Sequence, residues 1–121
     1  MAAARINQQT LETLRSLQSE GDPDIILEIS DLFFTTSPVK IEKIEQSLSA
    51  GQISAARAEA HGLKSSAYAL GAEILASICQ SIENLGDHEP FKDLALNLRK
   101  EYDSTATELK KVAAEMSSGR I

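Results

Sequence analysis

The sequence has few of the residues that build disulfides, aromatic cores and tight turns. Its 121 residues include 1 cysteine, 3 prolines, 6 glycines and no tryptophan, and aromatic residues make up 4%. One cysteine excludes an intramolecular disulfide, which is typical of a chain from a reducing compartment. Since aromatics are scarce, the core must be made of leucine, isoleucine and alanine. That palette favours helix over sheet.

Long apolar runs and basic clusters are also missing. No stretch approaches the roughly 18 apolar residues that span a bilayer, and the first residues lack the apolar region of a signal peptide. The formal net charge is −6, which disfavours nucleic acid and anionic membranes as partners because both repel an acidic chain. We therefore expect a soluble, cytoplasmic monomer that binds neither nucleic acid nor membrane.

The segments between the turn-forming residues have helical periodicity, and none alternates like a half-buried strand. Ser37-Pro38 repeats the cap-and-proline signal of Asp22-Pro23, so both pairs predict a helix start. The expected helices cover about 7–19, 23–36, 38–50, 53–70, 72–85 and 91–116. Short connections between them favour antiparallel neighbours. The predicted fold class is all-α: one domain over residues 1–121, ordered from about 7 to 116 with a frayed tail at 117–121. An up-down four-helix bundle carries one or two additional N-terminal helices packed across it.

Each expected helix has an apolar stripe that should face the core. The first helix should turn Leu11, Leu14 and Leu17 to one side. The later stripes include Ile25, Ile26, Leu27, Ile29, Leu32, Phe33, Phe34, Ile41, Ile44, Leu48, Leu75, Ile78, Cys79, Ile82, Leu85, Phe91, Leu94, Leu98, Tyr102, Leu109, Val112 and Met116.

The stretch AHGLKSSAYALGA, residues 60–72, holds one of the two histidines. On a helical wheel with 100° per residue, Leu63, Ala67 and Leu70 form the core stripe, nearly opposite His61. Lone helical histidines are often buried or idle surface residues, and the wheel argues against burial. His61 therefore points outward, on the same side as Arg57 at i−4 and Lys64 at i+3.

The surroundings of His61 are those of a reactive or docking residue. Ala58, Gly62, Ser65 and Ala69 are small and leave the imidazole above a low surface, and Tyr68 adds an outward aromatic of the kind found at interfaces. Gly62 in mid-helix costs roughly 1 kcal/mol relative to alanine, so close approach or access must compensate. A neutral imidazole can accept a phosphoryl group on nitrogen, and neighbouring cations can offset its charge.

Other candidates have plainer readings. Cys79 lies on a buried stripe and is expected to be core packing. His88 lies in a turn and is expected to be solvated. Glu59-x-His61 is too thin for a metal site, since no third ligand stands at usable spacing. The stretch Gly62–Ser65 lacks the frame of a phosphate-binding loop. We expect no cofactor of the chain's own.

The motif resembles the histidine-containing phosphotransfer (HPt) domains of multistep bacterial phosphorelays. Their signature is roughly Ala-His-x-Leu-Lys-Gly-Ser-(Ser/Ala)-x-x-Leu-Gly-Ala, followed by a Leu-Cys pair and an acidic or amide residue. This chain has Ala60–Ala72 in that pattern, then Leu75, Ile78-Cys79 and Ile82-Glu83. The resemblance covers about residues 10–115. One departure is Ser65, where the family usually has glycine and a partner approaches closely.

The resemblance implies a phosphoryl carrier rather than an enzyme with turnover. His61 would be phosphorylated on Nε2, Lys64 would stabilise the phosphohistidine, and Glu83 would orient the imidazole. Ser66 would help hold the neighbouring backbone, while Leu63 and Gly71 match structural positions. The implied partners are response-regulator receiver domains, which would bring Mg²⁺, and a hybrid sensor kinase.

Two alternatives remain open from the sequence. A helical adaptor could use the His61 face to bind a signalling partner without phosphoryl chemistry, although the presence of both His61 and Lys64 favours a carrier. The chain could also be the phosphoacceptor module of a chemotaxis-type kinase, phosphorylated from ATP by a catalytic domain elsewhere.

Overall fold

The computed structural model describes residues 5–19, 21, 24–85 and 92–117. Among these residues there is no strand, and the helices are α1 (Gln8–Ser16), α2 (Ile25–Ser49), α3 (Ile53–Ala69), α4 (Glu73–Glu83) and α5 (Lys92–Ser117). The predicted all-α class is therefore confirmed for the described part of the chain. Of the frayed tail expected at 117–121, Ser117 is instead the last residue of α5, and residues 118–121 lie outside the described residues.

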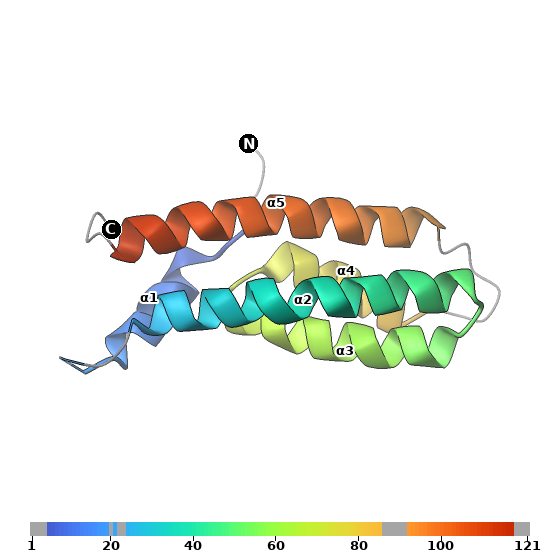
Figure 1. Cartoon of the computed structure of the whole chain (residues 1–121), viewed down its shortest axis with the longest axis horizontal. Coiled ribbons are helices and arrows are strands. Elements are labelled where there is room, and N and C mark those ends of the chain that lie inside the picture. The colour runs from blue at the N-terminus through green and yellow to red at the C-terminus, as the bar shows by residue number, and fades with distance from the viewer. Residues whose placement is uncertain (1–4, 20, 22–23, 86–91, 118–121) are drawn as a thin grey trace.

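The longer helices lie side by side in an elongated bundle (Figure 1). α3 packs against α2 and α4, α5 packs against the same two helices, and α1 packs on α2. In α5 the helical run is 26 residues, or about 39 Å at 1.5 Å per residue. α1 corresponds to the first expected helix, whereas the expected helices 23–36 and 38–50 are one helix, α2.

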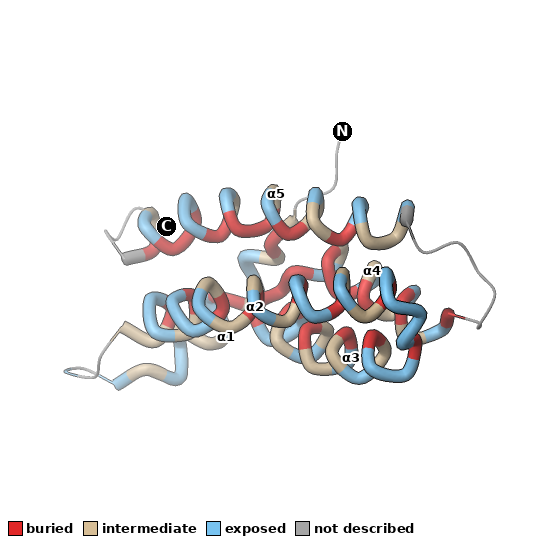
Figure 2. Tube along the Cα trace, turned by 45° about the vertical axis from the view of Figure 1, so that its right-hand side comes forward, coloured by how far each residue is buried: buried red, intermediate tan, exposed pale blue. Residues whose placement is uncertain are grey.

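In Figure 2 the buried stretches of α2, α3, α4 and α5 lie toward the middle of the bundle. The core is almost entirely aliphatic, as the shortage of aromatics predicts, and the rings of Phe33 and Tyr102 lie tilted against each other with 5.6 Å between their centroids. Its largest fully buried side chains are Phe33, Ile6, Leu11, Ile26, Ile41, Ile44, Leu63, Leu70, Leu75, Ile82, Leu98 and Leu109. Phe91, predicted to face inward, lies outside the described residues.

Three leucines predicted to face inward are exposed instead. Leu32 is 63% exposed, Leu27 is 40% exposed, and Leu17 is 72% exposed. Leu17 follows the last residue of α1, because the helix ends at Ser16. The apolar stripe of α2 is wider than the surface that its neighbours cover, so its outer members remain in water.

The predicted break at Ser37-Pro38 is wrong, because α2 continues through Pro38. A proline inside a helix removes one backbone hydrogen bond and costs about 3 kcal/mol or more. Phe33, Ser37, Ile41 and Ile44 are all buried, so one continuous face packs on both sides of the proline. Packing over that face outweighs the local signal.

Side chains cap the first two helices. Asn7 precedes α1 and accepts a hydrogen bond from the backbone N–H of Gln9 at 3.0 Å. Asp24 precedes α2 and accepts from the N–H of Ile26 at 3.0 Å, whereas the cap was expected at Asp22. Asp22 and Pro23 lie outside the described residues. Such caps satisfy N–H groups that the first turn of a helix leaves unpaired.

Gly71 is the middle residue of the α3–α4 connection and has a backbone conformation that other residues avoid. Its φ is +75°, and a Cβ at this position would lie 2.8 Å from the carbonyl oxygen of Asn7. The N–H of Asn7 donates to the Gly71 carbonyl at 2.8 Å. Glycine is required here both for the positive φ and for the close approach of the N-terminal segment. The expected structural role of Gly71 thus has a physical basis.

Candidate functional site

His61 lies in the middle of α3 with its side chain 70% exposed. The next two turns place Leu63 and Ala67 in the core, both fully buried, and Leu70 is 1% exposed. Leu63 anchors the helix so that the residue two positions earlier must face outward. The helical wheel therefore predicted the orientation of His61 correctly.

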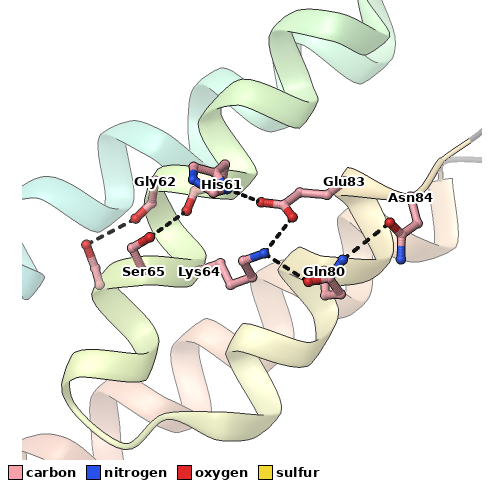
Figure 3. A network of polar contacts seen from close by, with 8 residues as sticks. His61, Gly62, Lys64, Ser65, Gln80, Glu83 and Asn84 are labelled. Carbon is pink, nitrogen blue, oxygen red and sulfur yellow. Dashed lines mark hydrogen bonds and ion pairs between the residues drawn. The ribbon is translucent and has the colours of Figure 1, made fainter.

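A short polar network holds one side of the imidazole (Figure 3). His61 Nδ1 lies 2.8 Å from Glu83 Oε1, and Lys64 Nζ donates to Glu83 Oε2 at 2.6 Å. Glu83 comes from the last residue of α4, and the other two come from α3. The Glu83 carboxylate thus connects α4 to both His61 and Lys64 on α3. Glu83 lies beside the imidazole, as the resemblance implied.

Gln80 completes this network and was missed from the sequence. Lys64 Nζ donates to Gln80 Oε1 at 2.9 Å, and Gln80 Nε2 donates to Asn84 Oδ1 at 3.3 Å. Gln80 precedes Glu83 by three residues, so both project from the same face of α4. That spacing was the available signal.

The pKa of the Glu83 carboxyl is held below its ordinary value of 4.5, chiefly by the hydrogen bond from Lys64, with the His61 bond adding to it. Glu83 is therefore an ionised carboxylate, which can only accept hydrogen bonds. It follows that His61 Nδ1 carries the hydrogen of this pair. In the neutral ring the lone pair is then on Nε2, which points away from Glu83.

Arg57 makes a contact that was not predicted from the sequence. Its Nη2 donates to the backbone carbonyl of Leu85, just beyond the end of α4, so this part of the guanidinium joins α3 to the end of α4. Cationic side chains commonly bind the unpaired carbonyls at helix ends. This contact gives Arg57 a structural role at the end of α4. The expected action of Arg57 on a phosphoryl group stays a prediction.

Three small residues of the motif lie around the backbone of His61. Ser65 Oγ donates to the His61 carbonyl at 3.2 Å, and Ser66 Oγ donates to the Gly62 carbonyl at 3.3 Å. The Ser66 contact is the backbone support that the resemblance implied. The hydroxyl of Ser65 is hydrogen-bonded within its own helix. A partner would therefore meet Ser65 mainly as a bulkier side chain than glycine. Gly62 is half-buried and is covered by the side chain of Lys40 from α2, where an open surface was expected.

The outer surface of α3 is otherwise as expected. Tyr68 is 54% exposed, and Ala58 and Ala69 are exposed. Small side chains therefore flank the imidazole along its helix, with one aromatic ring a little under two turns away. Their proposed contact with a partner stays a prediction.

The remaining candidates divide between core and undescribed chain. Cys79 is fully buried, and burial raises the pKa of its thiol to about 12, so the core assignment is confirmed. His88 lies outside the described residues. Within the described ranges, no three His, Cys, Asp or Glu side chains gather to hold a metal. Every helix described is too short or too polar to cross a bilayer.

The sequence of the chain matches one known protein family over most of its length. The family model of the Hpt domain matches residues 28–117, which include the histidine, the lysine and the glutamate of the network. The chain belongs to the Hpt domain family. The Hpt match begins in α2 and ends at the last residue of α5, so it spans the four long helices of the bundle.

A solved structure has the same fold. The crystal structure of histidine-containing phosphotransfer protein B from Pseudomonas aeruginosa PAO1 aligns with a TM-score of 0.79 over 94% of this chain and 98% of that one, at 20% sequence identity. No protein in the curated set matches the chain. At this identity the structural match supports the fold of the Hpt domain alone.

Proposed function

We propose that this protein is a phosphoryl carrier in a multistep phosphorelay. A receiver domain carrying an aspartyl phosphate docks over His61, and the phosphoryl group moves to Nε2. A second receiver then takes the group onto its own aspartate. The observation that carries this proposal is the exposed His61 ring, tethered through Nδ1 to Glu83 at 2.8 Å with Nε2 on the open side.

The transfer step balances without a further reagent. The lone pair of Nε2 forms the bond to phosphorus, the bond between phosphorus and the aspartyl oxygen breaks, and the aspartate leaves as a carboxylate. The ring then holds hydrogen on Nδ1 and phosphorus on Nε2, so it carries positive charge. The Glu83 carboxylate stabilises that charge. The Lys64 ammonium holds Glu83 in place and adds positive potential near the phosphorylated ring.

The protein's own part is positioning and charge stabilisation, which is most of what phosphoryl transfer requires. The receiver would supply the Mg²⁺ bound at its aspartate. A hybrid sensor kinase would supply the first receiver. We further propose that the carrier works in the cytoplasm as a monomer. It acts as a substrate of each receiver and not as an enzyme with its own turnover.

The test is transfer of ³²P from phosphorylated receiver domains of the same organism in the presence of Mg²⁺. We expect the protein to acquire label that is labile to acid and stable to alkali, because a phosphorus–nitrogen bond to imidazole has that stability. The His61→Gln variant should acquire none. Mass spectrometry of the labelled protein should place the group on His61.

The matched control is His88→Gln, which removes the one other histidine of the sequence and should leave labelling unchanged. Label on His61→Gln would disprove the site. If the folded wild-type protein takes label from none of the receivers of that organism, the carrier proposal is disproved. An adaptor that binds a partner through the same face would then be favoured.

A further inference from the structure

A second lysine lies against Gly62, the residue that follows His61, and it comes from α2, whereas the partners of Lys64 lie on α4. Lys40 projects from α2, and a Cβ built on Gly62 would lie 3.2 Å from its Nζ and 3.7 Å from its Cε. The ammonium group therefore rests against the backbone of α3, on the residue that follows His61. The Cβ that every other residue would place here is missing, so Gly62 leaves space for a cation from the neighbouring helix.

The contacts of the two lysines differ. Lys64 makes hydrogen bonds of 2.6 and 2.9 Å to Glu83 and Gln80, and its side chain is 17% exposed. Lys40 has Glu59 as an ion-pair partner at 4.0 Å, with the lysine side chain 33% exposed. An ion pair at that distance in partial contact with water is weak. Lys40 can therefore exchange its carboxylate for a stronger anion at little cost.

The imidazole directs its reactive nitrogen away from the Lys64 side. Nδ1 is bound to Glu83 on α4, and the two ring nitrogens point in diverging directions, so Nε2 points away from α4. In Figure 3 the α2 ribbon lies on the side of His61 opposite Glu83. A phosphoryl group on Nε2 would thus have α4 with Lys64 behind the ring and α2 with Lys40 on its other side.

We propose that Lys40 is a second cation for the phosphoryl group on His61. On phosphorylation its ammonium leaves Glu59 and binds a phosphoryl oxygen, while Lys64 keeps Glu83 in place. A lysine side chain has four rotatable bonds and three donors, and it binds phosphate as a compact point charge. This inference rests on the proposed phosphorylation of His61. It also explains why glycine, which has no Cβ, stands at position 62 beside Lys40.

The experiment measures single-turnover phosphorylation of His61 by two donors, a phosphorylated receiver and phosphoramidate alone. Lys40→Gln should slow both reactions about tenfold and shorten the lifetime of the phosphohistidine. Lys40→Arg should recover most of the rate, because it restores the charge. The matched control is Lys43→Gln, which removes the same charge from an exposed position of α2 and should stay within twofold of wild type.

The outcomes separate this inference from the carrier proposal. If wild type is labelled on His61 and Lys40→Gln behaves like Lys43→Gln, the second cation is disproved and the carrier stands. If Lys40→Gln slows transfer from the receiver and not from phosphoramidate, the lysine binds the partner and not the phosphoryl group, and the inference is also overturned. If wild type is never labelled, both proposals fail. Thermal unfolding of each variant verifies that the bundle is intact.

Discussion

Two carboxylates connect neighbouring helices of this bundle in different ways. Between α2 and α5, Glu45 receives two parallel hydrogen bonds from Arg99, at 2.6 Å from Nη2 and 3.1 Å from Nε. Between α3 and α4, Glu83 receives one bond from Lys64 and one from the ring of His61. The first carboxylate serves one partner with both oxygens, and the second serves two partners with one oxygen each.

The difference separates a structural contact from a site. In the bidentate pair, Arg99 bonds both oxygens of Glu45. This bonding raises the pKa of the arginine above its ordinary value. Glu83 instead accepts a hydrogen bond from an imidazole whose side chain is 70% exposed. Ion pairs between helices are common on bundles, and their contribution to stability is small. What distinguishes the second one is the exposed ring at its end.

Removing each carboxylate should give the largest contrast. In Glu83→Ala the imidazole loses the acceptor that fixes Nδ1, and we expect phosphorylation of His61 to slow about 10- to 100-fold. That range corresponds to the 1.5–3 kcal/mol typical of a hydrogen bond to a charged group. Glu45→Ala should leave the rate within twofold. Rapid-quench labelling from a phosphorylated receiver measures both, and equal slowing would show that loss of bundle packing is responsible.

Removing each cation should give a smaller contrast. Lys64→Ala leaves Glu83 without its shortest contact, so the carboxylate and the imidazole lose their fixed arrangement, and transfer should slow about tenfold. Arg99→Ala should leave transfer unchanged. Both variants should lower the free energy of unfolding by about 1 kcal/mol or less in urea titrations. A normal transfer rate in Lys64→Ala with a slow one in Arg99→Ala would reverse the assignment.

Acid should weaken the α3–α4 connection by the smallest of these effects. The folded-state pKa of Glu83 is lowered from 4.5, so its contribution to stability is present above that value and is lost as the pH falls through the folded-state pKa. Wild type should therefore lose unfolding free energy more steeply below pH 4.5 than Glu83→Gln does. Urea titrations over this acidic range measure the slope. Identical slopes would show that the carboxylate binds its proton equally in both states.

The sequence predicted the helices and the outward direction of His61 because both follow from local periodicity. It also placed Glu83 near the ring, through resemblance to the family. The continuity of α2 through Pro38 was beyond it, since that depends on a buried face spanning two segments. Lys40 was missed because it comes from another helix and is recognisable only by its contact with Gly62. Contacts between helices, unlike helix faces, depend on how the elements pack.

The buried thiol of Cys79 makes the molecule a reporter of its own opening. It is the one cysteine of the sequence, its side chain is fully covered, and its pKa of about 12 keeps it protonated at neutral pH, so a disulfide reagent must wait until the bundle opens. Cys79 immediately precedes Gln80 on α4, beside the polar network. The rate of thiol labelling therefore measures how often this helix separates from the core, and it can be read in every variant without adding a probe.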